Sequence, residues 1–173
     1  MKEPLDDLLD EAEAARAAGS TAWQELAEQE YQVIRFRSGG RELAVAIDAV
    51  ERTERVPLLT AVPLSPPFVR GVASLRGGVV CVLDLRPLLS AEEGDDVDLG
   101  EAKSLLVIRA GLRRVGLLSD NLPDFQRVGR GDTLPVPHGR LEIYRAALKA
   151  GGELVGILDP EKLFDLVETR LNG

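Results

Sequence analysis

The strongest constraint on the fold of this chain is an alternating hydrophobic pattern that occurs twice. In "YQVIRFRSGGRELAVAIDAV", residues 31–50, large apolar side chains recur at about every second position on both sides of a Ser-Gly-Gly turn, with Phe36 before it and Leu43, Val45 and Ile47 after it. The stretch "SLLVIRAGLRRVGLLSDNL", residues 104–122, has the same form, and the spacing from Val33 to Leu105 is 72 residues. Alternation on both sides of a glycine-containing turn is typical of a β-hairpin. We therefore predict one such hairpin in each half of the chain.

A second pair of similar segments has nearly the same spacing. "GGVVCVLDLRPLL" begins at Gly77, and "GGELVGILDPEKLF" begins at Gly151, 74 residues later. Each segment combines a glycine pair, a strand-length apolar run, an aspartate, a proline and two closing apolar residues. Two pairs of similar segments at almost equal spacing indicate an internal duplication of a small β unit.

The duplication predicts a mainly β fold with two similar five-stranded β-barrel subdomains of the SH3/OB type, packed together. A chain of 173 residues with 45% hydrophobic content can bury one sizeable core but not two large independent ones. We expect the body of the protein at 31–173, in halves of about 31–92 and 101–173. The acidic segment "EEGDDVDLGE", residues 92–101, is the expected loop between these halves.

A short helix is expected to end the chain. Asp159 is a suitable N-cap, and Pro160 is suited to the first helical position that follows it. The spacing of the apolar residues in "EKLFDLVETRL" predicts that one face of this helix packs inward. That face consists of Leu163, Phe164, Val167 and Leu171.

Residues 1–30 form an acidic extension in which we expect amphipathic helices. Nine Asp or Glu side chains stand there against Lys2 and Arg16, so this segment carries −7 of the formal net charge of −8. Leucines at helical spacing occupy one face, and Thr21 with Gln24 forms a capping box for a second short helix. Two interpretations stay open. Either the extension packs on the body or frays in solution, or its leucines bind a partner.

The composition excludes several functional classes. A net charge of −8, with a nearly neutral body, argues against nucleic acid as a partner, because phosphate binding needs a basic face. The single cysteine, Cys81, cannot form an internal disulfide, which fits a reducing compartment. No apolar run approaches the roughly 20 residues that a membrane-spanning helix needs, and the acidic N-terminus is unlike a secretory signal. We therefore expect a cytoplasmic protein.

Catalytic chemistry also lacks the residues it needs. "LRGGVV" precedes a β-branched run, whereas a phosphate loop ends in Lys-Ser or Lys-Thr and opens a helix. Cys81 is expected as an inert strand thiol with a raised pKa, and His138 as a solvated loop side chain. The acidic clusters at 6–7 and 95–98 lack the spacing of a calcium loop. We expect no catalytic residue, no cofactor and no metal.

The remaining function is recognition, and the motifs here resemble those of a known family. "FVRGVASLRGGVVCVLDLR", residues 68–86, is similar to the signature of the CheW-type chemotaxis coupling family. The similarity extends back through the first hairpin and forward through "VIRAGLRRVGLLSDNL" to "ILDPEKLF", so it covers about 31–167. Each motif is modest alone, but four in the same order are specific. The acidic extension lies outside this resemblance.

The resemblance implies an adaptor that links chemoreceptor signalling tips to the regulatory domain of a CheA-type histidine kinase. By position, a receptor-facing groove between the subdomains would include Val50, Leu75 and Arg76. The resemblance implies a kinase contact in the hairpin and connector residues before Pro63. An alternative is that Arg76 forms an internal ion pair with Asp84, and the two roles of Arg76 are compatible.

Two further features bear on this surface. Gly71 and Gly77 flank the run "VASLR" and are expected to hold backbone angles or close approaches that a β-carbon would obstruct. Arg52 and Thr53 stand where many family members carry an acidic residue and an isoleucine, so the charge is reversed beside the expected contact surface. We include Arg52 among the partner-binding residues.

Three functions therefore remain as hypotheses. The leading one is the adaptor between receptors and kinase. The second is a divergent CheW-like protein that has lost one of these contacts and serves a specialised pathway. The third is an enzyme on a small β-barrel, which the absence of a nucleophile with a base, or of a metal cluster, disfavours.

Overall fold

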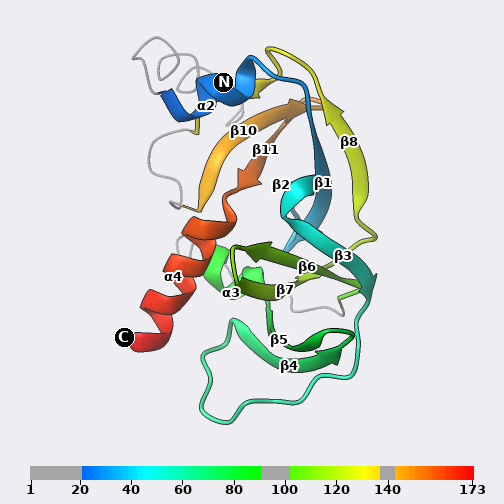
Figure 1. Ribbon diagram of the computed structural model, residues 1–173, viewed down its shortest axis with the longest axis vertical. Helices are drawn as coiled ribbons and strands as arrows, with labels where there is room; N and C mark the ends of the chain where they lie inside the picture. The colour runs from blue at the N-terminus through cyan, green and yellow to red at the C-terminus, as the bar shows by residue number, and fades with distance from the viewer. Residues whose placement is uncertain (1–20, 91–101, 137–142) are drawn as a thin grey trace, which may run out of the picture.

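The computed structural model describes residues 21–90, 102–136 and 143–173, which fold into two sheets and three α-helices (Figure 1). The first sheet contains β1 (Tyr31–Ser38), β2 (Arg41–Ala46), β8 (Asp124–Val128), β9 (Thr133–Leu134), β10 (Tyr144–Ala150) and β11 (Glu153–Leu158). The second contains β3 (Val50–Arg55), β4 (Val69–Leu75), β5 (Gly78–Leu83), β6 (Ser104–Ala110) and β7 (Arg113–Ser119). The helices are α2 (Thr21–Ala27), α3 (Leu85–Ser90) and α4 (Pro160–Asn172), and a 3-10 turn, η1 (Ile47–Ala49), precedes β3.

Each sheet takes strands from both halves of the sequence. The strand orders are β8-β1-β2-β11-β10-β9 and β3-β6-β7-β5-β4, so each predicted hairpin, β1–β2 or β6–β7, lies beside a hairpin from the other half. The joining pairs, β2 with β11 and β5 with β7, are parallel. The expected mainly β fold with two similar units is confirmed. The division into halves at about 31–92 and 101–173 stays a prediction about the repeat along the sequence. In the structure, each sheet combines one hairpin from each half.

Two of the hairpins, β1–β2 and β10–β11, share the same tight turn. Gly39 and Gly40 lie between β1 and β2 with φ values of +60° and +76°. Gly151 and Gly152 lie between β10 and β11 with φ values of +58° and +79°. A two-residue loop with positive φ at both positions matches the twist of the paired strands, and glycine adopts that conformation without steric cost. The glycine pairs thus fix the register of both hairpins.

The largest core cluster joins the two sheets. Its buried side chains come from both sheets and from α3 and α4, and they include Phe36, Leu43, Leu83, Leu89, Leu106, Leu117, Leu158 and Leu163. Two smaller clusters lie within one sheet each, around Val33 and Ile157 in the first and around Val82 and Leu105 in the second. Full burial of a leucine or phenylalanine contributes about 1.5–3 kcal/mol. The shared cluster therefore makes the two sheets one folding unit.

The C-terminal helix begins as predicted. The Asp159 carboxylate caps α4 by accepting hydrogen bonds from the backbone N–H groups of Glu161 and Lys162, at 3.0 and 3.4 Å. The buried residues of the helix are Leu163, Phe164 and Val167. The prediction that Leu171 faces inward is wrong, because Leu171 is 50% exposed. It lies in the last turn of α4, which extends beyond the sheets (Figure 1).

The described end of the acidic extension packs on the first sheet. The expected second helix is confirmed as α2, whose Leu26 and Ala27 contact the cluster around Val33. The carbonyl of Ala27 also accepts a hydrogen bond from the N–H of Gly131, at 3.0 Å. The expected first helix of the extension, most of the expected loop at 92–101 and His138 are predictions that concern residues outside the described ranges. No helix in the described ranges is long and apolar enough to cross a membrane.

Candidate functional site

Most of the predicted partner-binding residues lie around the turn between β4 and β5. Arg76 and Gly77 are the central residues of this turn, which pairs Leu75 with Gly78. The side chain of Arg76 is exposed, while Leu75 is half-buried against the inner cluster of the second sheet. Gly77 has a φ of +96°, a conformation that favours glycine at the second central position of a turn. The turn therefore presents the Arg76 guanidinium to solvent.

Two further arginines bind the backbone of this turn. Arg52, on β3, donates from Nη2 to the carbonyl oxygen of Arg76 at 2.5 Å. Arg114, on β7, donates from Nη1 to the carbonyl oxygen of Gly77 at 3.0 Å. The carboxylate of Glu51 lies 3.3 Å from both guanidiniums and joins them. We call this arrangement of Glu51, Arg52, Leu75, Arg76, Gly77 and Arg114 the β4–β5 corner.

Sequence reasoning does not assign Glu51 or Arg114 to the site. The only signal for Glu51 is its position beside Arg52, and the only signal for Arg114 is the arginine pair in "LRRVG". Arg114 reaches the corner because β7 pairs with β5 in parallel, a contact between segments more than 30 residues apart. A local hydrophobic pattern cannot predict that pairing.

Val50 lies at the inner end of the strand that carries Arg52. It follows η1, where the chain passes from the first sheet to the second, and its half-buried side chain packs against the shared core. The ladder between β3 and β6 shifts register between Val50 and Arg52. The structure thus brings Arg52, Leu75 and Arg76 together at the corner and leaves Val50 nearer to the junction between the sheets.

Gly71 lies within β4, where the connector of residues 56–68 approaches the strand. Thr60 and Val72 exchange two backbone hydrogen bonds of 2.9 Å, which hold the connector against the edge of β4. A β-carbon on Gly71 would lie 2.4 Å from the carbonyl oxygen of Thr60, and the φ of Gly71 is +142°. On Gly77 a β-carbon would meet only the Arg114 guanidinium, at 3.6 Å. Close approach constrains Gly71, whereas backbone conformation constrains Gly77.

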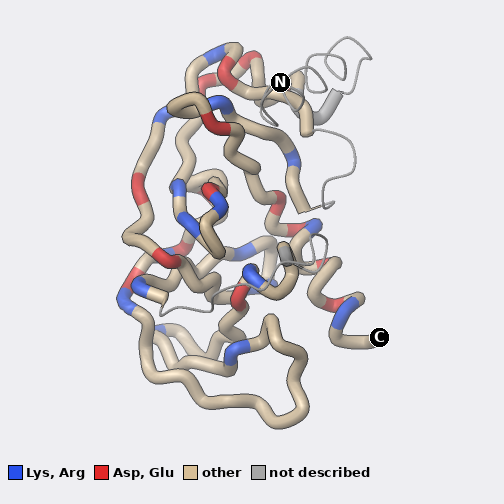
Figure 2. The backbone as a smooth tube through the Cα atoms, turned by 180° about the vertical axis from the view of Figure 1, so that it is seen from behind, with Lys and Arg blue, Asp and Glu red and all other residues tan. Residues whose placement is uncertain are grey.

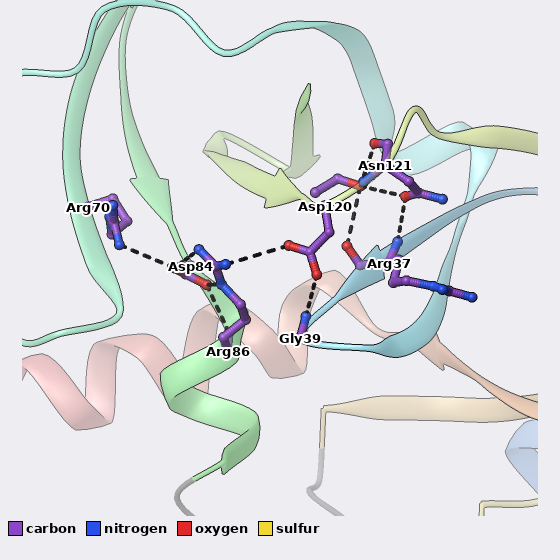
Figure 3. Close-up of polar contacts among 8 residues, drawn as sticks. Arg37, Gly39, Arg70, Asp84, Arg86, Asp120 and Asn121 are labelled. Atoms are coloured by element: carbon purple, nitrogen blue, oxygen red, sulfur yellow. Dashed lines mark hydrogen bonds and ion pairs between the residues drawn. The ribbon is translucent and has the colours of Figure 1, made fainter. Parts of the chain in front are cut away.

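Asp84 pairs with arginines other than Arg76 (Figure 3). Arg86 donates from Nε and Nη2 to the Asp84 carboxylate at 2.9 and 2.7 Å, and the two side chains are only 3% and 1% exposed. Arg70 lies 3.6 Å from the same carboxylate. Asp84 also caps α3, because its Oδ1 accepts the N–H of Arg86 at 3.0 Å. Asp84 therefore forms its buried ion pair with Arg86, at the start of α3, and not with Arg76.

The same contacts continue to the first sheet. The carboxylate of Asp120, after β7, lies 3.7 Å from the Arg86 guanidinium and accepts the N–H of Gly39 at 2.7 Å (Figure 3). Asn121 accepts the N–H of Arg37 at 2.9 Å, and the carbonyl of Arg37 accepts the N–H of Asp120 at 2.8 Å. These polar contacts join α3 and β7 to the β1–β2 hairpin, so they link the two sheets.

Cys81 is placed on β5 and is half-buried. Burial raises the pKa of its thiol, as predicted, because the thiolate loses solvation. The thiol therefore stays protonated and weakly nucleophilic at neutral pH. Within the described ranges, the structure has no group of three or more His, Cys, Asp or Glu side chains that could hold a metal ion.

The chain is similar to known proteins over most of its length. The model of the CheW-like domain family matches residues 32–168. Chemotaxis protein CheW of Klebsiella aerogenes is 30% identical over 164 residues, covering 92% of this chain and 93% of its own. Protein FrzA of Myxococcus xanthus is 32% identical over 149 residues, covering 83% and 91%. The crystal structure of the scaffolding protein TtCheW from Thermoanaerobacter tengcongensis matches with a TM-score of 0.64 and 18% identity, over 76% of this chain and 85% of that one.

These similarities extend further than the motifs predict. The share of this chain that matches the Klebsiella protein is larger than residues 31–173 can supply, so the match reaches into the acidic extension. The similarity to TtCheW is one of fold alone at this level of identity. It agrees with the two-sheet arrangement described above.

Proposed function

This chain belongs to the CheW-like domain family, and we propose that it is a non-enzymatic adaptor that couples chemoreceptors to a CheA-type histidine kinase in bacterial chemosensory signalling. The observation that carries the proposal is the family match over 32–168, together with relatives that are chemotaxis proteins and match over nearly their whole length. These partners would place the protein in the cytoplasm. The proposal needs two separate binding surfaces.

The receptor-facing surface that we propose is the β4–β5 corner with Val50. An arginine with an exposed guanidinium can bind carboxylates or carbonyl groups on a partner, while its alkyl stem covers apolar surface. Arg76 has this exposure, and Leu75 supplies a half-buried apolar side chain next to it. Arg52 contributes through the carbonyl of Arg76, to which it is bound.

The kinase-facing surface that we propose is the connector between β3 and β4. It carries no charged residue from 56 to 68, and Figure 2 shows it as an uncharged segment along the bottom of the molecule. Leu58 and Val62 are 92% and 41% exposed there, and Leu64 is fully exposed. Exposed apolar side chains grouped on one segment favour a protein partner. The regulatory domain of the kinase is the partner that the family implies.

Separate binding isotherms with a receptor signalling-domain fragment and with the kinase test this proposal. We expect wild-type protein to bind both. Arg76→Ala should weaken only receptor binding, and Leu58→Asp should weaken only kinase binding. Arg127→Ala, which removes an exposed arginine from β8 on the other sheet, is the matched control and should change neither. Binding to a single partner would favour the specialised, one-contact protein, and binding to neither would contradict the proposal.

A further inference from the structure

We infer that the β4–β5 corner selects an acidic segment of its partner, with Arg76 as the contact residue and with Arg52 and Arg114 as positioning residues. The inference rests on the proposed function, because it specifies the chemistry that the receptor-facing surface recognises. It depends on three observations about the corner, namely its charge, the way its arginines are used, and the apolar side chains around it.

The corner has an excess of positive charge. It contains three arginines, Arg52, Arg76 and Arg114, and one carboxylate, that of Glu51, which pairs with Arg52 and Arg114, so the formal charge of these four residues is +2. The charge is local, because the chain as a whole carries −8. Arg76 contributes a guanidinium that has no ion pair or hydrogen bond with any described residue, although its side chain is exposed. A partner carboxylate would therefore meet an available donor and a favourable potential.

The other two arginines are hydrogen-bonded to the backbone of the turn. Arg52 and Arg114 are only 29% and 24% exposed, and each donates a hydrogen bond to one of the two successive carbonyls of the turn. Between them, Glu51 holds both guanidiniums at 3.3 Å. A turn with a glycine at its centre is flexible by itself. Binding its carbonyls from both sides fixes the backbone from which Arg76 projects, and this lowers the entropy cost of binding.

Two apolar residues flank the turn along the chain. Leu75 is half-buried on one side of the turn, and Val79, at the start of β5, is 65% exposed on the other. A segment that carries a carboxylate next to an apolar side chain would satisfy both features. Such a mixed contact gives specificity through the charge and affinity through the buried apolar area.

The first test measures binding to the receptor signalling-domain fragment. Arg76→Ala should weaken affinity by about tenfold or more, the usual effect of removing an interfacial arginine anchor. Arg76→Ala should also make affinity less dependent on salt concentration, because salt no longer has the attraction between the Arg76 guanidinium and the partner's carboxylates to screen. Arg52→Gln and Arg114→Gln should weaken binding by a few fold while the salt dependence persists, and Arg52→Lys should recover much of the loss. Equal affinity for all of these variants and for Arg127→Ala would overturn the inference.

A second test does not depend on the receptor. An NMR titration with a glutamate-only peptide should shift the amide resonances of residues 75–78, and Arg76→Ala should abolish these shifts while Arg127→Ala retains them. If the receptor fragment fails to bind but the peptide shifts are confined to this turn, the proposed receptor is wrong and the acidic selectivity stands. Shifts spread evenly over all exposed arginines, or none at the turn, would overturn the selectivity whatever the receptor does.

Discussion

Replacing Asp84 by asparagine should destabilise the protein by about 3 kcal/mol. The substitution leaves the Arg86 guanidinium buried without its main counter-charge, and breaking a buried ion pair from one side costs about 3–5 kcal/mol. Asp120, at 3.7 Å from that guanidinium, offsets part of the cost, so we expect the lower end of the range. Asparagine retains an oxygen that can cap α3, so the loss reports on the charge and not on the helix cap.

Urea unfolding followed by circular dichroism measures this loss, which corresponds to a fall in Tm of about 6–12 °C for a domain of this size. The double variant Asp84→Asn with Arg86→Met removes the buried guanidinium as well, and its free energy of unfolding should exceed that of Asp84→Asn by more than about 1 kcal/mol. Arg37→Met, which breaks an ion pair with Glu42 at the surface, is the control and should cost at most about 1 kcal/mol. A loss below about 1 kcal/mol for Asp84→Asn, or a double variant no more stable than the single one, would refute the reasoning.

Three other outcomes are expected. Gly71→Ala should lower the unfolding free energy by about 1–3 kcal/mol, because its β-carbon would meet the Thr60 carbonyl and its φ is strained, and an unchanged urea midpoint would contradict this. Because burial raises the pKa of the Cys81 thiol, iodoacetamide should alkylate the folded protein more slowly than the unfolded one, and equal alkylation rates would argue against burial. The free energy of unfolding should also fall as the pH rises above about 9, because the thiol of the unfolded chain ionises at a lower pH than that of the folded chain. Leu163→Ala should lower the free energy of unfolding by about 2–5 kcal/mol and Leu171→Ala by less than about 0.5 kcal/mol, because only Leu163 is buried. Losses of similar size for the two variants would contradict this difference in burial.

The sequence predicts the local elements well because their causes are local. Alternating apolar residues around glycine turns are sufficient to predict β1–β2 and β6–β7, and Asp159 with Pro160 predicts the start of α4. The sequence does not predict that each sheet combines hairpins from both halves of the chain. Two similar repeats can pair within a copy or between copies with the same local contacts, so the repeat does not predict that β2 lies beside β11.

The site shows the same division between local and distant contacts. Sequence motifs bring Leu75 and Arg76 to one turn, but they do not predict that Arg52 binds the Arg76 carbonyl or that Arg114 completes the corner. Those bonds depend on long side chains that cross between strands, and hydrophobic periodicity predicts only the face of a strand. The pairing of Asp84 with Arg86 depends on the six-residue helix α3, because Asp84 is the N-cap of this helix and Arg86 lies in its first turn. The repeat holds one signal for that helix, because Asp84 occupies the place in its segment that Asp159, the N-cap of α4, occupies in the matching one.

Co-sedimentation of the kinase with receptor signalling domains tests the adaptor role most directly. The kinase and a membrane-anchored or clustered receptor fragment are mixed with wild-type protein, with Arg76→Ala, with Arg127→Ala or with no third protein, and the kinase in the pellet is measured. The account predicts that wild-type and Arg127→Ala proteins carry the kinase into the pellet and that Arg76→Ala carries much less. Kinase that pellets equally in the absence of this protein, or that stays in the supernatant when wild-type protein is present, would contradict it.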